Sequence, residues 1–336
     1  MVAWIRSDPR VQYGFTAIAV AGCTYLWTQG LSHHNIMWVF VGIAAALILA
    51  GLVGGIRLLL VVLVLSCVSI YVFALHIYPP KLHWVAGEAF LADPMHFHGT
   101  DEPELEQLRR EIGIEQGMNE LDDGTARALF LTDWVADQWA HSGSNQPSNP
   151  DPLTILREAE EGSSFRCVEY AIVLAGTAQA MGMPARVVGL KTRRADTARS
   201  GAGHVVTEIW LDDLGKWAFA DGQFGYMVTL DGTPLSAVEL QQALARGLAG
   251  LEVVSGEGPV AWLATTHYLI WINPYLYHFD FALDQRHFLH PSERQGGALM
   301  LIPSGKEPLE VFQRQYPLWG YTYTSNLEAF YREPGY

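Results

Sequence analysis

The first 78 residues contain three long apolar stretches separated by short polar connections. The stretches run over Val11–Trp27, Ile36–Val53 and Leu58–Ile77, and the second contains no charged residue. A hydrocarbon core about 30 Å thick needs roughly 20 helical residues to cross it. The pattern therefore predicts three transmembrane helices, of which the first is the least apolar.

Positive charges set the expected orientation of these helices. Arg6 and Arg10 precede the first stretch and Arg57 lies in the second connection, whereas the first connection has no Lys or Arg. Basic residues favour the cytoplasmic side, so we expect everything after Tyr78 outside the cytoplasm, at a bacterial inner (plasma) membrane. The alternative is a lipoprotein, because Val20-Ala21-Gly22-Cys23 resembles a lipid-attachment box. Two further apolar stretches would make that anchor redundant.

Beyond the apolar stretches the pattern first has helical spacing and then alternates. Apolar residues at helical spacing predict helices, and strict alternation predicts strands. Two of the strands flank a Gly-containing turn, which indicates a hairpin. The expected helices are Asp101–Met118, Thr125–His141, Leu153–Glu161 and Ser236–Ala249, and the expected strands are Arg186–Lys191, His204–Leu211, Lys216–Asp221 and Leu299–Pro303.

Residues 260–277 form a further long apolar stretch that is rich in aromatic residues. Its Trp, Tyr and His content and the Asn273-Pro274 pair favour a buried or interfacial helix, with a fourth membrane span as the alternative. The chain is thus expected to have four parts. They are a membrane anchor (1–78), a connector with a helix (79–124), a core (125–232) and an aromatic-rich C-terminal extension (233–336).

Charge and cysteine content narrow the possible functions. The chain has 21 Lys and Arg against 35 Asp and Glu, and very few of these precede residue 79. An acidic soluble part disfavours nucleic acid and anionic lipid as partners. Cys23 and Cys67 lie in apolar stretches, so Cys167 has no second cysteine with which to form a disulfide. This excludes a thiol–disulfide oxidoreductase that relies on Cys-x-x-Cys.

Cys167 is placed where a nucleophile is expected. The polar loop Ser163–Arg166 precedes it, and an apolar helical run follows it as far as Gly182-Met183-Pro184. The thiol should therefore lie in the first turn of a helix, where unpaired N–H groups and the positive end of the helix dipole favour the thiolate. Only the thiolate is a good nucleophile.

The predicted hairpin supplies the other residue types that such a nucleophile needs. His204 begins one strand and Asp221 ends the next, so the two can stand side by side near the start of the helix. An imidazole can take the proton of a thiol, and a carboxylate fixes the tautomer of the imidazole. The order Cys, His, Asp therefore predicts a catalytic triad.

This part of the chain, about residues 125–225, resembles the transglutaminase-like superfamily. The spacing of 37 residues from Cys to His and 17 from His to Asp is of the family's usual size. The resemblance implies an α+β fold with a papain-like core, in which the helix bearing the cysteine packs on an antiparallel sheet, here preceded by three transmembrane helices. It rests on Cys167–Ala171, Gly182-Met183-Pro184-Ala185-Arg186, His204–Trp210 and Lys216–Asp221.

The resemblance also implies a role for each site residue. Cys167 would be the acyl-accepting nucleophile, His204 the general base and acid, and Asp221 the group that orients the histidine. The backbone N–H of Cys167 would be one oxyanion donor, and Gln138 and Trp139 are candidates for the second.

Two positions depart from the family pattern, which leaves the substrate open. Arg166 precedes the cysteine and Gly222 follows the aspartate, where the family often has other residues. Glu169 and Glu208 are expected to be structural, paired with Arg166 or Arg186.

The sequence thus predicts a membrane-anchored thiol acyltransferase or hydrolase acting on amide bonds, of transglutaminase, peptidase or amidase type. Its expected partners are a peptide or other amide-containing substrate and the lipid bilayer, without nucleic acid. No cofactor or metal is expected, because His96 and His98 have no acidic cluster nearby. The alternative is a non-catalytic scaffold or assembly subunit of a membrane complex. It would dock through aromatic residues of the C-terminal region: Trp262, Trp271, Tyr275, Tyr277, Phe279 and Phe281.

Overall fold

The computed structural model describes residues 80–87, 95–99, 101–286 and 297–335. The three expected transmembrane segments and Cys23 lie outside the described residues. Pro79–Tyr336 forms one compact unit. Within the described part of the chain, no helix combines the length and the apolar character that crossing a bilayer requires.

The helices that precede the sheet in the sequence largely follow the prediction. Two begin at an aspartate whose side chain accepts a backbone N–H of the first turn, Asp123 for α7 and Asp151 for α8. The single helix predicted over Asp101–Met118 is wrong. Gly113 adopts a φ of 63° and ends the first helix there, so two helices form. These helices are α5 (Pro103–Ile112), α6 (Glu115–Asn119), α7 (Gly124–Ala136), α8 (Pro152–Glu160) and α9 (Cys167–Ala180).

The centre of the described part is a ten-stranded sheet in the order β12-β9-β8-β1-β2-β3-β4-β6-β7, with β5 beside β4. All its pairs are antiparallel except β9 with β12. The four predicted strands are confirmed as β1, β2, β3 and β9. The strands are β1 (Ala185–Lys191), β2 (Gly203–Leu211), β3 (Lys216–Asp221), β4 (Tyr226–Leu230), β5 (Thr233–Pro234), β6 (Leu251–Ser255), β7 (Gly258–Pro259), β8 (His278–Ala282), β9 (Ala298–Leu301) and β12 (Tyr321–Thr324), and β10 (Val311–Phe312) pairs with β11 (Tyr316–Pro317) separately.

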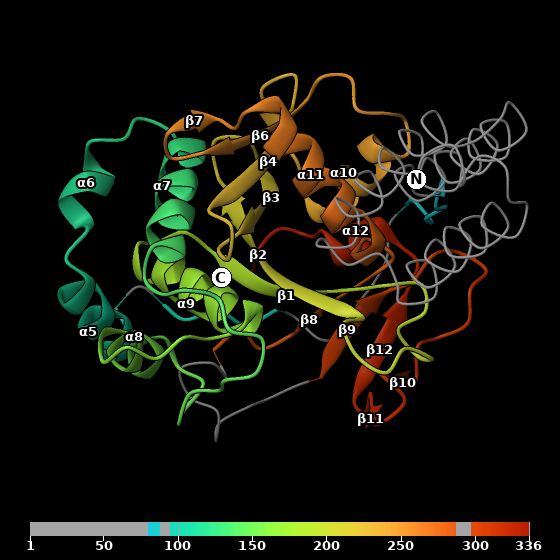
Figure 1. The fold of residues 1–336 in the computed structure, drawn as a ribbon, viewed down its shortest axis with the longest axis horizontal. Helices are drawn as coiled ribbons and strands as arrows, with labels where there is room; N and C mark the ends of the chain where they lie inside the picture. The colour runs from blue at the N-terminus through green and yellow to red at the C-terminus, as the bar shows by residue number, and fades with distance from the viewer. Residues whose placement is uncertain (1–79, 88–94, 100, 287–296, 336) are drawn as a thin grey trace, which may run out of the picture. The chain divides into compact units, whose positions relative to one another are not determined.

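Alternate side chains of the central strands point into two different cores. Val187 and Ile209 pack with the residues of α7 and α9, whereas Val188 and Val206 pack with those of α10 and α11. Successive residues of a strand face opposite sides of the sheet, so both faces must be covered. Figure 1 shows α7 and α9 on one side of the strands and, on the other, α10 (Ala237–Leu244), α11 (Trp262–Ile272) and α12 (Leu327–Phe330).

The aromatic stretch 260–277 folds into α11 and the short 3-10 helix η1 (Asn273–Tyr275). Tyr268, Leu269 and Ile272 of α11 are buried in the core, as expected of a buried helix. The same C-terminal region adds β6 beside β4 and β8 beside β1, with β9 and β12 following outward from β8. It therefore completes the sheet that carries the predicted hairpin.

A buried ion pair connects this C-terminal region to β1 and β2. The Arg186 guanidinium donates to the Glu208 carboxylate at 2.7 and 3.0 Å and to the backbone oxygen of Phe330 at 2.8 Å. Glu208 also accepts from the backbone N–H of Ala237 and from the hydroxyl of Tyr331. The expected pairing of Glu208 is confirmed. The guanidinium lies 4.2–5.1 Å from the ring centroids of Phe281, Trp217, Phe330 and Tyr331.

Candidate active site

Cys167 is the first residue of α9, and its side chain is partly exposed. The residue before it, Arg166, has an extended backbone and caps the helix start. The buried carboxylate of Glu169 accepts the backbone N–H of Arg166 at 3.0 Å and its guanidinium at 2.5 Å, so this expected pairing is confirmed too. Glu169 thereby fixes the turn that presents the thiol.

His204 and Asp221 meet at the adjoining ends of β2 and β3. The Nε2 atom of His204 lies 2.8 Å from Oδ2 of Asp221, and both side chains are buried. Cys167 lies close enough to His204 to contribute to the rise of its pKa. Because Nε2 faces the carboxylate, Nδ1 is the ring nitrogen left for the thiol. The structure thus brings together all three residues that the sequence singled out.

The charges around His204 favour its protonated form. Burial lowers the pKa of the imidazole, but the charge and hydrogen bond of Asp221, together with Cys167, outweigh burial and raise that pKa to about 10. His204 is therefore an imidazolium at neutral pH. An imidazolium next to Cys167 stabilises the thiolate electrostatically.

Asp221 is held by three donors. Besides His204, the backbone N–H of Gln223 donates to Oδ1 at 3.1 Å and the hydroxyl of Tyr268 donates to Oδ2 at 2.7 Å. Burial, followed by the charge of Asp221, raises the pKa of Tyr268 well above its ordinary value. The phenol therefore stays protonated and remains a donor, which keeps the carboxylate in position.

An aromatic wall from α11 and η1 covers the histidine. The ring centroid of Trp271 lies 4.7 Å from that of His204 in an edge-to-face arrangement, and that of Tyr275 lies 6.0 Å away. Burial, followed by the charge of Cys167, raises the pKa of Tyr275. The wall limits the access of water to the ring, so the charges inside attract one another more strongly.

Sequence reasoning missed these aromatic residues and one histidine. Tyr268, Trp271 and Tyr275 lie about 50 residues beyond Asp221, and no local spacing indicated that α11 returns to the site. His141, whose pKa is lowered by burial and then by the charge of His204, also lies near the pair. The aromatic composition of the 260–277 stretch is the available signal, but in the sequence it equally indicates a surface that docks onto a larger complex.

The aromatic residues considered for docking are mostly used inside the fold. Tyr277, Phe279 and Phe281 are buried, and Tyr275 faces the active site. Trp262, by contrast, is 77% exposed.

The two candidates for the second oxyanion donor differ in what their N–H groups do. The side-chain nitrogen of Gln138 already donates to the backbone oxygen of Trp134 at 2.7 Å. The indole Nε1 of Trp139 is buried and finds no partner among the residues that the structure describes. Its ring packs 4.3 Å from that of Tyr170, one turn after Cys167. Of the two, Trp139 has the unused donor.

Replacing Tyr268 by Phe is expected to lower the rate of any reaction at Cys167 about tenfold without unfolding the protein. The variant removes one of the donors that hold Asp221, a loss of about 1.5 kcal/mol for a hydrogen bond to a charged group. A shift of the pH profile of Cys167 alkylation would separate this positioning role from a structural one. Tyr226→Phe is the matched control, since Tyr226 lies in the same aromatic cluster and pairs with Asp221 across β3 and β4, but its hydroxyl forms no hydrogen bond with Asp221 among those that the structure describes. Equal rates and pH profiles for the two variants would contradict the role of Tyr268.

Comparison with known families agrees with the sequence resemblance. Residues 112–222, about a third of the chain, match the model of the transglutaminase-like superfamily, and all three site residues lie within them. The resemblance predicted from the sequence is thereby confirmed for this segment. The antiparallel sheet with the cysteine-bearing helix packed on it is consistent with the transglutaminase-like, papain-like fold.

A solved structure that is similar to this chain is a candidate cysteine protease from Cytophaga hutchinsonii. It is 13% identical, with a TM-score of 0.29, and the match covers 47% of this chain and 52% of that one. This chain thus matches about half the length of that protein. No curated protein matches the chain. The family match thus identifies residues 112–222 as a transglutaminase-like domain.

Proposed function

We propose that the protein is a membrane-anchored thiol acyltransferase or hydrolase that acts on amide bonds. The observation that supports the proposal is the grouping of three side chains. His204 is hydrogen-bonded to Asp221 through Nε2, and its imidazole interacts with Cys167. Nucleophile, base and orienting group in this order are what acyl transfer through a thioester requires.

In the first half of the reaction the Cys167 thiolate attacks the carbonyl carbon of the amide. The tetrahedral intermediate carries an oxyanion, which the backbone N–H of Cys167 and the indole N–H of Trp139 would stabilise. The C–N bond then breaks, and the imidazolium of His204 gives its proton to the leaving amine. A thioester on Cys167 and a neutral His204 result.

In the second half a water molecule or an amine attacks the thioester. Neutral His204 takes the proton of the attacking group, the C–S bond breaks, and the Cys167 thiolate leaves. The imidazolium and thiolate are restored, and the product is a carboxylic acid or a new amide. Asp221 keeps Nε2 of the histidine occupied throughout, so that Nδ1 handles both proton transfers.

Trapping the thioester tests this proposal. The full chain in detergent micelles is mixed with a peptide library, with and without hydroxylamine as the amine, then quenched in acid and analysed by mass spectrometry. We expect acyl adducts on Cys167 in the wild type, hydroxamates when hydroxylamine is present, and no adduct in Cys167→Ala. A wild type that forms no adduct with any peptide or activated ester would count against catalysis. A cellular phenotype that survives Cys167→Ala would then favour the scaffold alternative.

Anchorage is the second component of the proposal and is supported by the three apolar stretches before Tyr78. The protein should sediment with membranes, resist extraction by alkali and dissolve in detergent. In spheroplasts, added protease should degrade the part of the chain after Tyr78. Release by alkali, or protection from the protease, would contradict the anchor or its orientation respectively.

A further inference from the structure

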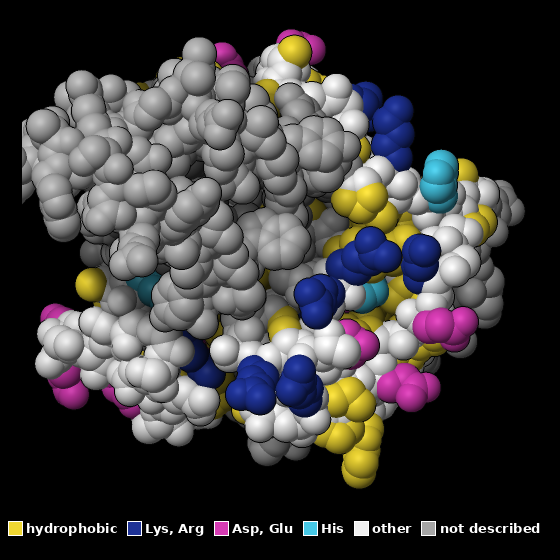
Figure 2. Space-filling view, turned by 45° about the vertical axis from the view of Figure 1, so that its right-hand side comes forward, with side chains coloured by type: hydrophobic (Ala, Val, Ile, Leu, Met, Phe, Trp, Pro, Cys, Tyr) yellow, Lys and Arg dark blue, Asp and Glu magenta, His cyan; other side chains and the backbone are white. Residues whose placement is uncertain are grey.

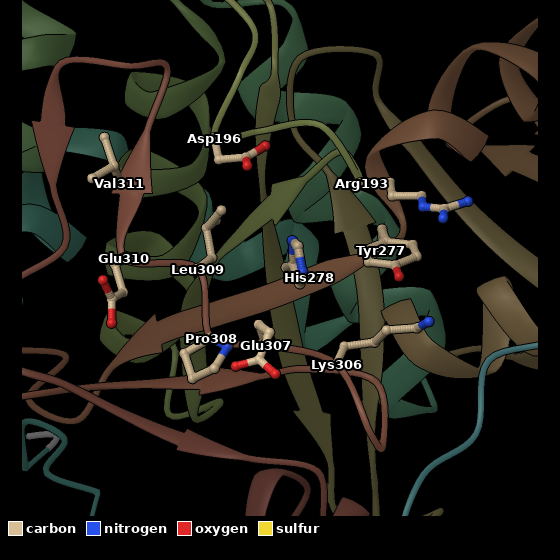
Figure 3. A pocket seen from close by; sticks show the side chains of 10 residues that line it. All are labelled: Arg193, Asp196, Tyr277, His278, Lys306, Glu307, Pro308, Leu309, Glu310 and Val311. Carbon is tan, nitrogen blue, oxygen red and sulfur yellow. The ribbon is translucent and has the colours of Figure 1, made fainter.

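A pocket of about 530 Å³ opens between the loop that follows β1, the start of β8 and the segment before β10 (Figure 3). Its size is within the range of about 300–1,000 Å³ that small-molecule sites occupy. Its floor is buried and consists of Tyr277, His278 and Leu309. Charged, exposed side chains form the rim: Arg193, Asp196, Lys306, Glu307 and Glu310.

His278 has a ring nitrogen in this floor that no described residue satisfies. Its side chain is 5% exposed, and Nδ1 is buried without a partner among the described residues. Burial, followed by the charge of Lys191, lowers the pKa of His278 to about 4, so the ring is neutral at pH 7. A neutral imidazole has one donor and one acceptor nitrogen, and leaving either of them buried and unsatisfied is costly.

The rim is divided by charge. In the view of Figure 3, Arg193 and Lys306 lie on the Tyr277 side of His278, and the three carboxylates lie on the other side. None of these five side chains forms an ion pair with another residue that the structure describes. Lys and Arg side chains also gather, beside hydrophobic side chains and a histidine, on the face shown in Figure 2, although the chain as a whole is acidic.

We propose that the pocket binds an amino acid or short peptide that carries both a free ammonium and a free carboxylate. The carboxylate would pair with Arg193 and Lys306, and the ammonium with the acidic side of the rim. One ammonium N–H would be donated to Nδ1 of His278. A simple anion would meet three carboxylates, a simple cation would leave both basic side chains unpaired, and an apolar ligand would leave the histidine unsatisfied.

Two chain segments connect the pocket to the active site. Tyr275, which faces His204, is separated from Tyr277 by Leu276, and Leu276 bridges to Lys191 at the end of β1. The pocket contains none of the three catalytic candidates, so binding of the zwitterion there does not depend on the proposed function.

Calorimetric titration of trialanine into the full chain in detergent micelles tests the site. The Cys167→Ala variant is used so that no turnover occurs. We expect trialanine to bind, and N-acetyl-trialanine and trialanine amide to bind about tenfold more weakly, because each lacks one charge-assisted hydrogen bond. Inorganic phosphate is the probe for a plain anion site. Equal affinity for the three peptides, no binding of trialanine, or binding of phosphate in its place would overturn the proposal.

Variants locate the site. His278→Phe and Arg193→Ala should each weaken the binding of trialanine about tenfold. Arg194 is an exposed neighbour outside the pocket, so Arg194→Ala should leave the affinity unchanged. If His278→Phe fails to fold, as circular dichroism would show, Arg193→Ala and Glu307→Gln carry the test. If the folded pocket variants bind trialanine with the affinity of the parent protein, the assignment of the binding site to this pocket is overturned.

The two proposals fail separately. Loss of thioester formation with trialanine binding intact rejects the proposed function but leaves the binding site. Thioester formation without trialanine binding rejects the pocket alone.

Discussion

Alkylation of Cys167 by iodoacetamide should be fast at pH 6–7 and should slow about a hundredfold or more when His204 is replaced by Ala. Iodoacetamide reacts with the thiolate, and the protonated imidazole is the charge that stabilises it. Since the pKa of His204 is raised to about 10, the histidine keeps its proton from acid to mildly alkaline pH and loses it only near pH 10.

Three variants make the alkylation experiment decisive. Asp221→Asn should also slow the reaction, because it removes the charge that keeps His204 protonated. His141→Ala is the control for a nearby histidine that contacts neither Cys167 nor Asp221 directly in the described hydrogen bonds. Cys167→Ala identifies the alkylated residue by mass. If His204→Ala is alkylated as fast as the wild type, the thiolate–imidazolium pair does not exist and the catalytic interpretation fails.

Replacing Arg186 by Ala should lower the free energy of unfolding of the described unit by about 3–5 kcal/mol, the usual cost of breaking a buried ion pair from one side. The variant leaves the Glu208 charge buried with only Ala237 N–H and the Tyr331 hydroxyl as donors. It also removes the cation that packs against four aromatic rings. These rings belong to β3, β8 and the segment at the end of α12, which therefore lose a common contact.

Thermal or urea unfolding, followed by near-ultraviolet circular dichroism, measures this loss. Glu208→Gln should behave similarly, because the guanidinium is then buried without its counter-charge. Arg110→Ala is the matched control, since its exposed pair with Glu106 contributes at most about 1 kcal/mol. A change below about 1 kcal/mol for Arg186→Ala would show that water or neighbouring donors compensate the buried carboxylate.

Local patterns were sufficient wherever neighbours in sequence decide the structure. The polar loop before Cys167 and the apolar run after it predicted α9, and the alternation around the turn after Leu211 predicted the β2–β3 hairpin. The hairpin geometry alone places the end of β3 beside the start of β2. His204 and Asp221 could therefore be assigned as neighbours from the sequence.

Local patterns failed where a single backbone angle or a segment distant in the sequence decides the structure. Gly113 ended a helix that the charge pattern would have continued, because a left-handed residue cannot be inferred from helical periodicity. The strands β6, β8 and β12 span only four or five residues each, and such short segments did not stand out from the surrounding sequence.

By itself, the sequence determined the family resemblance, the nucleophile at a helix start, the histidine and aspartate on a hairpin, and the acidic character of the part after the apolar stretches. Only the tertiary structure decided that α11 supplies Tyr268 to Asp221 and Trp271 to His204. It also decided that His278 lies with an unsatisfied ring nitrogen in a pocket of divided charge. The physical reason is that hydrogen bonding and periodicity act between residues close in sequence, whereas the burial of apolar surface joins any segments that pack well, however far apart along the chain.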